Sequence, residues 1–139
     1  TNTIDEALLE AQKSIGAAVK GSVNPFFNSK YADLGAVMKV IKKPLNDAGL
    51  SVTQEVGYTI TKEGVVHDTL ATTIRHVSGM RLRSVARIPP TPDIQKFGGA
   101  ISYMKRYTLQ AIFFVPTEDD DGNIVVAPTK KKKDKLVFT

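Results

Sequence analysis

The stretch from Pro92 to Phe113 constrains the fold most, because its pattern is that of one long, two-faced helix. Thr91 is predicted to cap the N-terminus, with Pro92 in the first helical position and Asp93 in the electropositive first turn. At 3.6 residues per turn, one stripe is suited to face the core, and it comprises Ile94, Phe97, Ile101, Met104, Thr108 and Ile112. The rest of the chain must supply the surface that covers this stripe.

The opposite face of the same stretch mixes cations with flat aromatic rings. It gathers Lys96, Tyr103, Arg106, Tyr107 and Gln110, with Lys105 at its margin. Cations hold phosphates and rings offer stacking platforms, so such a face is typical of a surface that binds a nucleic-acid strand. The alternative is an exposed basic face whose tyrosines cover neighbouring apolar atoms.

Composition narrows the class of protein. With 139 residues, 42% of them hydrophobic, the chain can bury one core, and no apolar run approaches the roughly 20 residues of a membrane span. The absence of cysteine excludes thiolate catalysis, disulfides and cysteine-based zinc sites, and it favours an intracellular address. The N-terminus, at Thr1, lacks the layout of a signal peptide. The formal net charge of +5 favours a polyanionic partner.

Two shorter helices are predicted in the N-terminal third of the chain. A capping-box pattern, T-x-x-E, begins at Thr3 and opens a helix over residues 4–20. Asp33 is a good N-cap for a second helix that ends near Gly49. The segment between the two helices again places a cation beside an aromatic ring, in Lys30 and Tyr31.

From Leu50 the hydrophobic period changes to two, which predicts strands. They are expected over residues 50–61 (as one strand or two), 65–75 and 80–88, with turns near residues 62–64 and 76–79. In the last strand, alternate positions project three arginines from one face, namely Arg81, Arg83 and Arg87. Like charges stacked along a strand repel, so one interpretation is an anionic partner. The other is an edge strand whose solvated arginines prevent aggregation.

An acidic run from Glu118 to Asn123 follows the long helix. Carboxylates can bind Mg²⁺ or Ca²⁺, but the spacing does not match an EF-hand loop and no second carboxylate cluster accompanies the run. No cofactor is therefore expected, and Mg²⁺ near Asp119, Asp120 and Asp121 is the alternative to a solvated acidic loop. No nucleotide-binding G-x-x-x-x-G-K-[ST] motif is present. Residues 1–127 are predicted to form one domain, and residues 128–139 a lysine-rich, disordered tail.

Several motifs occur in the order and spacing of one known family. They are NPFFNSKYADL from Asn24, KPLNDAGLSVTQ from Lys43, TLATTIRHVSGM from Thr69, QKFGGAISYMKRYTLQAIF from Gln95 and EDDDGN from Glu118. Through them the chain resembles the essential recombination function (ERF) family of single-strand annealing proteins, known mainly from bacteriophages and prophages. The resemblance covers roughly residues 4–123. Phe97 and Gly99 stand where relatives often have other residues, and the lysine-rich end lies outside the family pattern.

The resemblance implies a homo-oligomer, a ring or a helical filament, that binds single-stranded DNA and anneals complementary strands in phage recombination. It implies no enzymatic activity and no nucleotide hydrolysis, and it places the protein in the cytoplasm of the bacterial host. The implied fold is a curved antiparallel sheet crossed by a long helix. That fold agrees with the order of elements predicted from the residues: an α+β fold with N-terminal helices, an antiparallel sheet of three to four strands and a long helix packed across it.

The residues predicted to bind DNA supply phosphate contacts and stacking surfaces. The phosphate contacts are Lys30, Arg81, Arg83, Arg87, Lys96, Lys105 and Arg106, and the stacking rings are Tyr31, Tyr103 and Tyr107. The expected DNA partners are a single strand and the annealed duplex. We hypothesise that the strand lies in a groove between the arginine face of the sheet and the polar face of the long helix.

Two other functions compete with annealing. One is a protein adaptor whose basic tail meets an acidic partner, such as the terminus of a single-strand-binding protein. The other is a metal-dependent nuclease that uses Asp119, Asp120 and Asp121.

Overall fold

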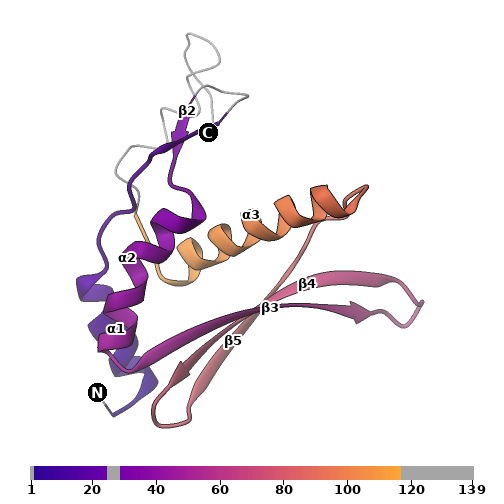
Figure 1. The fold of residues 1–139 in the computed structure, drawn as a ribbon. Coiled ribbons are helices and arrows are strands. Elements are labelled where there is room, and N and C mark those ends of the chain that lie inside the picture. Colours follow the sequence, from indigo (N-terminus) through magenta and orange to yellow (C-terminus); the bar gives the residue numbers. More distant parts are fainter. Residues whose placement is uncertain (1, 25–28, 117–139) are drawn as a thin grey trace, which may run out of the picture.

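A computed structural model describes residues 2–24 and 29–116. In chain order the elements are α1 (Ile4–Ser14), β1 (Ser22–Asn24), β2 (Ser29–Tyr31), α2 (Leu34–Asp47), β3 (Leu50–Ile60), β4 (Val66–His76), β5 (Arg81–Arg87) and α3 (Ile94–Ile112). Three strands form an antiparallel sheet, α3 crosses one face of it, and α1 and α2 lie together at one end (Figure 1). The predicted α+β fold is confirmed.

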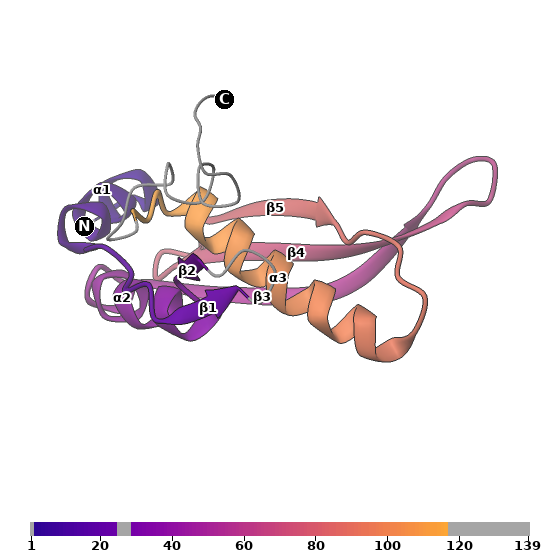
Figure 2. The same cartoon turned by 90° about the horizontal axis from the view of Figure 1, so that it is seen from above.

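In the sheet, β4 is the central strand and β3 and β5 are its two edges. The β3–β4 pairing runs from Leu50 opposite His76 to Ile60 opposite Val66, whereas β5 pairs with β4 only from Arg81 to Arg87. Because β5 is shorter, the distal part of the β3–β4 hairpin projects as a two-stranded ribbon (Figure 2). Positive φ angles at Gly64 and Gly79 close the two hairpins, where an L side chain would be strained.

Hydrogen bonds from Gln54 on β3 identify the sheet face that α3 covers. The Gln54 side-chain amide donates to the hydroxyl of Thr108 on α3 at 3.1 Å and to the hydroxyl of Thr72 on β4 at 3.1 Å. Gln54 and Thr72 are directly opposite each other in the register, so their side chains share one face. That face lies under α3.

The long helix begins later than predicted. Its N-cap is Asp93 rather than Thr91, because the Asp93 carboxylate accepts the backbone N–H of Lys96 at 2.8 Å. An aspartate that satisfies a free N–H in the first turn also favours the positive end of the helix dipole. The helical part therefore spans Ile94–Ile112.

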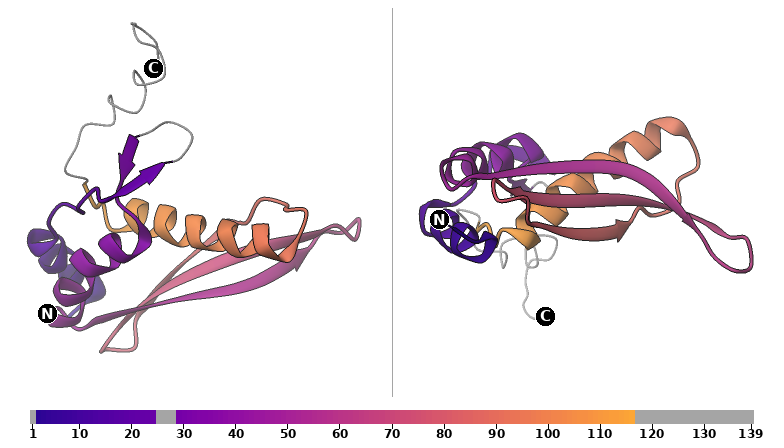
Figure 3. Two further views of the ribbon diagram at one scale, coloured as in Figure 1. Left: turned by 45° about the horizontal axis from the view of Figure 1, so that its top comes forward. Right: turned by 90° about the horizontal axis from the view of Figure 1, so that it is seen from below.

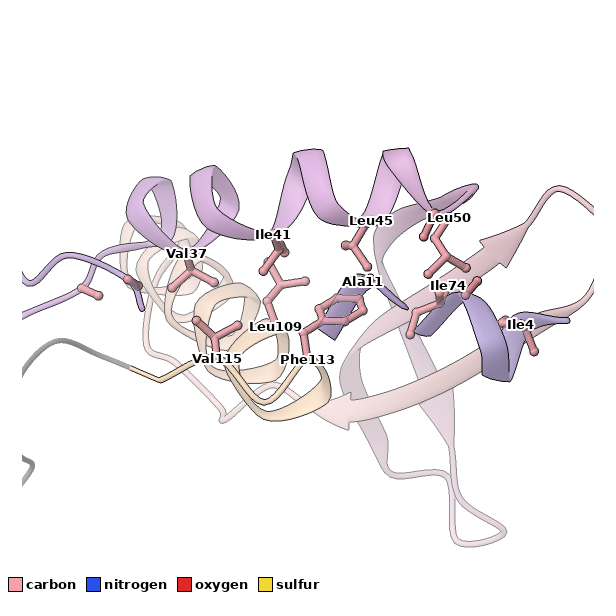
Figure 4. Close-up of a cluster of buried hydrophobic side chains, with 14 residues drawn as sticks. Ile4, Ala11, Val37, Ile41, Leu45, Leu50, Ile74, Leu109, Phe113 and Val115 are labelled. Carbon is pink, nitrogen blue, oxygen red and sulfur yellow. The ribbon is translucent and has the colours of Figure 1, made fainter. Parts of the chain in front are cut away.

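The core lies where α1, α2, the C-terminal half of α3 and the near ends of β3 and β4 meet (Figure 4). Its larger members include Ile41, Leu45, Leu50, Ile74, Leu109 and Phe113. Leu109 is the one buried residue of α3, whereas Ile94 is 83% exposed, so the predicted apolar stripe is partly wrong. The reason is that α3 crosses the sheet diagonally, so its N-terminal half runs out past the β3 edge, away from α1 and α2 (Figure 2).

The first helix starts as predicted but ends at Ser14 instead of Lys20. At its start, the Thr3 hydroxyl accepts the Glu6 N–H and the Glu6 carboxylate accepts the Thr3 N–H, each at 3.1 Å. At its end, Ile15 is extended, and the N–H of Ala18 donates to the carbonyl of Pro116 at 2.9 Å. The chain after α1 thus pairs with the segment after α3 instead of continuing the helix.

Asp33 is the N-cap of α2, as predicted, and it also links β1 to the start of this helix by a hydrogen bond. Its carboxylate accepts the N–H of Ala36 at 2.9 Å and the hydroxyl of Ser22 at 2.8 Å. These hydrogen bonds, the one from Ala36 first, hold the pKa of Asp33 below its usual range, and the charge of Arg106 adds to the effect. The small β1–β2 hairpin stands apart from the main sheet, near α2 and the C-terminal half of α3 (Figure 3).

None of the helices in residues 2–24 and 29–116 is long and apolar enough to cross a membrane. The predicted division into residues 1–127 and a tail at 128–139 stays a prediction, because residues 117–139 lie outside the described part of the chain.

Truncation of Leu109 to alanine is expected to lower the free energy of unfolding by about 2–5 kcal/mol, because it leaves a cavity between α2 and α3. Ile94→Ala is the matched control on the same helix, and its effect is expected to stay within about 0.5 kcal/mol because Ile94 is exposed. Denaturant unfolding measures both values. Equal losses from the two variants would contradict this account of the core.

Asp33→Asn is expected to reduce stability at neutral pH, because asparagine retains the capping geometry but loses the charge that the N–H of Ala36 and Arg106 favour. Because the pKa of Asp33 is lower in the folded protein than in the unfolded chain, its ionised carboxylate stabilises the folded state at pH values above the unfolded-state pKa, about 4. This stabilisation is lost as the pH falls through the folded-state pKa of Asp33. The stability difference between wild type and variant should therefore shrink below about pH 4. Thermal unfolding between neutral and acidic pH tests this, with Glu63→Gln in the exposed β3–β4 turn as control.

Candidate nucleic-acid interface

A cluster of three tyrosines and one arginine occupies the side of α3 that faces away from the sheet. Tyr103, Arg106 and Tyr107 come from α3, and Tyr31 comes from β2. The guanidinium carbon of Arg106 lies 5.2 Å from the ring centre of Tyr31 and 5.1 Å from that of Tyr103. Two rings thus hold the cation by cation–π contacts, which joins the small hairpin to the long helix.

Helical spacing explains how the rings come together. Tyr103 and Tyr107 are four residues apart, so their side chains lie one above the other on α3, with ring centres 5.9 Å apart and planes inclined by 13°. Gln110 is four residues beyond Arg106, and its side-chain oxygen accepts a hydrogen bond from the guanidinium at 3.2 Å. Each member of the cluster is therefore positioned by its neighbours.

The cluster remains open to solvent and keeps its positive charge. Tyr103 is 53% exposed and Tyr107 is 57% exposed, while Arg106 is half-buried against the rings of Tyr31 and Tyr103. Ion pairs within the described residues join Lys13 with Glu10 and Lys43 with Asp47, and none joins Arg106 to a described carboxylate. A guanidinium that is fixed but not neutralised can still bind an anion such as a phosphate.

The other cations predicted for this interface come from β2 and α3. Lys30 lies on β2 directly before Tyr31, and Lys96 is exposed in the first turn of α3. Lys105 is half-buried and lies elsewhere, at a cavity of about 460 Å³ between α2, β3 and α3. Leu34, Met38 and Leu109 also line that cavity. The structure therefore brings Arg106 together with the three tyrosines but separates Lys105 from them.

The arginines of β5 lie on the other side of the molecule. Arg83 is directly opposite Thr73, whereas its neighbour Ser84 is opposite Thr72, whose side chain is on the face that α3 covers. Successive side chains of a strand alternate between faces, so Arg81, Arg83 and Arg87 point away from α3. No described helix covers the sheet from that side (Figure 3). The three arginines do share one exposed face, as predicted.

The hypothesis of a DNA groove between the arginine face and the polar face of α3 is therefore wrong. The sheet itself and the packed side of α3 lie between the two surfaces. The chain offers two separate basic surfaces on opposite sides of a two-layer body: the tyrosine–arginine cluster on α3 and the arginine face of β5.

Sequence reasoning missed two residues of the arginine face. They are Arg75 and His67, both on β4. Arg75 is directly opposite Arg81 on β5, and Nδ1 of His67 lies 2.9 Å from the Arg87 guanidinium. The hairpin turn at residues 76–79 was predicted, and counting back from it would have placed Arg75 beside Arg81. On this face, a hollow of about 390 Å³ between Arg83 of β5 and β3 has Thr69 and Ala71 of the central strand among its lining residues.

The acidic residues Asp119, Asp120 and Asp121 lie outside the described residues, so the structure does not bear on the alternative of a Mg²⁺ site there. Within the described ranges, no group of three or more His, Asp or Glu side chains could hold a metal ion.

Comparison with known proteins connects these surfaces to a family. A search of curated proteins and a search of solved structures each found no significant match. A scan against protein-family models matched the ERF superfamily over residues 4–137, which is nearly the whole chain and includes both basic surfaces. The chain therefore belongs to the ERF superfamily.

Proposed function

We propose that this protein binds single-stranded DNA and anneals complementary strands as a homo-oligomer, without nucleotide hydrolysis. Membership of the ERF superfamily implies a role in phage recombination and an interaction with DNA. The observation that carries the finer proposal is the cluster in which Arg106 is held between Tyr31 and Tyr103. Annealing itself makes and breaks no covalent bond, so a protein that holds and presents strands is sufficient.

The cluster on α3 fits an unpaired strand better than a duplex. The exposed rings of Tyr103 and Tyr107 can stack on bases, and a base is free to stack on a protein ring only when it is outside a helix. Arg106 lies against the rings of Tyr31 and Tyr103, beside Tyr107, where it can hold the phosphate of a nucleotide whose base stacks on the cluster. Because stacking does not depend on base identity, this grip is independent of sequence, as annealing of arbitrary strands requires.

The arginine face of β5 serves as a separate phosphate contact in this proposal. It presents Arg81, Arg83 and Arg87 without a carboxylate partner among the described residues. Arg75 stands directly opposite Arg81, and like charges in that position repel until an anion lies between them. The α3 cluster would thus hold bases and phosphates, and the sheet face phosphates alone. Assembly of several copies would turn weak contacts on each into avidity for a long strand.

Tyr103→Ala and Tyr107→Ala are each expected to weaken single-strand binding by about 1–3 kcal/mol, which corresponds to roughly 5- to 150-fold in Kd. Duplex affinity should change much less, because paired bases do not use the rings. Fluorescence anisotropy with a labelled oligonucleotide, single-stranded beside duplex, measures both.

The matched controls are Tyr103→Phe and Tyr107→Phe, which keep the ring and should keep the affinity. Wild-type affinity in both alanine variants would remove the cluster from the proposal. If the wild type binds no single strand even at low salt, the annealing function is wrong and the adaptor function takes its place.

Replacement of Arg81, Arg83 and Arg87 together by glutamine is expected to flatten the dependence of log affinity on log salt. Each phosphate contact on single strands contributes about 0.7 to this slope, so loss of three contacts should reduce it by about 2. A variant with Lys13, Lys43 and Lys62 changed to glutamine removes the same net charge from other surfaces and should retain the slope. The tyrosine variants should also retain it. An unchanged slope in the arginine variant would show that the β5 face does not contact DNA.

A further inference from the structure

No strand of the described residues pairs with β3 or β5 on its outer side, and these two edges of the sheet differ in character. The β3 edge is 11 residues long, contains no proline and carries one charged side chain, Glu55. Its pairing with β4 is continuous from Leu50 to Ile60, so no bulge twists the edge away. Natural proteins usually protect an edge strand with lysines, prolines or bulges, because its unpaired N–H and C=O groups can pair with another chain. The β3 edge has none of these protections.

The β5 edge carries the opposite charge. Its outer face presents Arg81, Arg83 and Arg87, all exposed, and Pro89 and Pro90 follow the strand. Glu55 lies on the same outer face of the sheet, because Glu55, Ala71 and Val85 are aligned across the three strands. One edge is therefore positive and the other mildly negative on one common face.

We propose that the β5 edge of one copy pairs with the β3 edge of a second copy, so that the sheet continues from subunit to subunit. The inference rests on the homo-oligomer of the proposed function and names the surface that builds it. Both β3 and β5 run antiparallel to β4, so they run parallel to each other. A second copy added in the same orientation forms a parallel pair.

Such a contact joins two different edges, so each new subunit offers a free edge to the next one. Contacts of this kind close into rings or extend as filaments, depending on the rotation between subunits. The charges on the two edges favour pairing of β5 with β3 over pairing of β5 with β5. Pairing of β5 with β5 would set arginines against arginines, whereas pairing of β5 with β3 brings Glu55 of one copy among the arginines of the other.

The inner face of the sheet, on the side of α3, supports the same pairing. On β3, Val56 is 49% exposed and Tyr58 is 66% exposed, and on β5, Leu82 is 44% exposed. All three share the face that carries Gln54 and Thr72. Joined edges place the apolar residues of β5 in one copy beside those of β3 in the next, which removes apolar surface from water.

The cysteine-free sequence allows a direct test by crosslinking without DNA. Glu55→Cys protein is mixed in turn with Arg81→Cys, Arg83→Cys and Arg87→Cys protein, oxidised mildly and separated on a non-reducing gel. A covalent dimer is expected in at least one mixture and in greater amount than for either protein alone. Lys13→Cys mixed with Glu55→Cys is the control, because Lys13 lies on α1 and belongs to neither edge strand. Absence of the dimer in all three mixtures, with the wild type oligomeric, would overturn the proposal.

The mass of the assembly gives a second readout. Glu55→Arg places like charges at the joint and is expected to shift the protein toward the monomer in light scattering, while Lys13→Glu leaves the mass unchanged. An unchanged mass for Glu55→Arg, or a wild type that is monomeric at every concentration, would also overturn it. The affinity of the wild type for single-stranded DNA is measured separately. Crosslinking without DNA binding would refute the annealing function alone. DNA binding without crosslinking would refute this interface alone.

Discussion

The packing of α3 on a single face of the β3–β4–β5 sheet determines which side chains can act together. Gln54 bridges the two layers through Thr108, and the alternation of side chains along each strand then assigns every residue of the sheet to the inner or outer face. The tyrosines of α3 and the arginines of β5 end up on opposite surfaces for this reason. A thin, two-layer body gives a small chain two large faces without requiring a second domain.

The surroundings of Arg106 differ from those of an ordinary surface arginine. Long cationic side chains usually lose rotamer freedom when they bind a ligand, and this loss weakens binding. Here Tyr31, Tyr103 and Gln110 restrict the guanidinium beforehand, without neutralising its charge. The same contacts connect β2 to α3, so the geometry of the cluster depends on the docking of the β1–β2 hairpin. In the proposed function, strand binding at Arg106 therefore depends on the local folding of this hairpin.

Local signals in the sequence were sufficient for much of the fold. The capping box at Thr3, the N-cap at Asp33 and the change of period at Leu50 each act over a few residues, and the structure confirms all three. What periodicity cannot specify is which element covers a given face. Leu109 is buried and Ile94 is exposed because α1 and α2 reach only one end of α3. The hypothesis of a DNA groove was wrong for the same reason. The alternation of side chains placed the β5 arginines on one face, but only the sheet register and the contact of Gln54 with α3 identified that face as the outer one.

The hydrogen bond from Ala18 to Pro116 joins the segment after α1 to the segment after α3, and so closes almost the whole described chain into a loop. Contacts between residues so distant in sequence slow folding, because the entropy of loop closure is lost before many other contacts offset it. The N-terminal helix and the end of α3 are therefore expected to join late, after the β3–β4 hairpin has formed. A nascent chain would leave the parts of α1 and α2 that the end of α3 covers exposed until synthesis had passed Pro116.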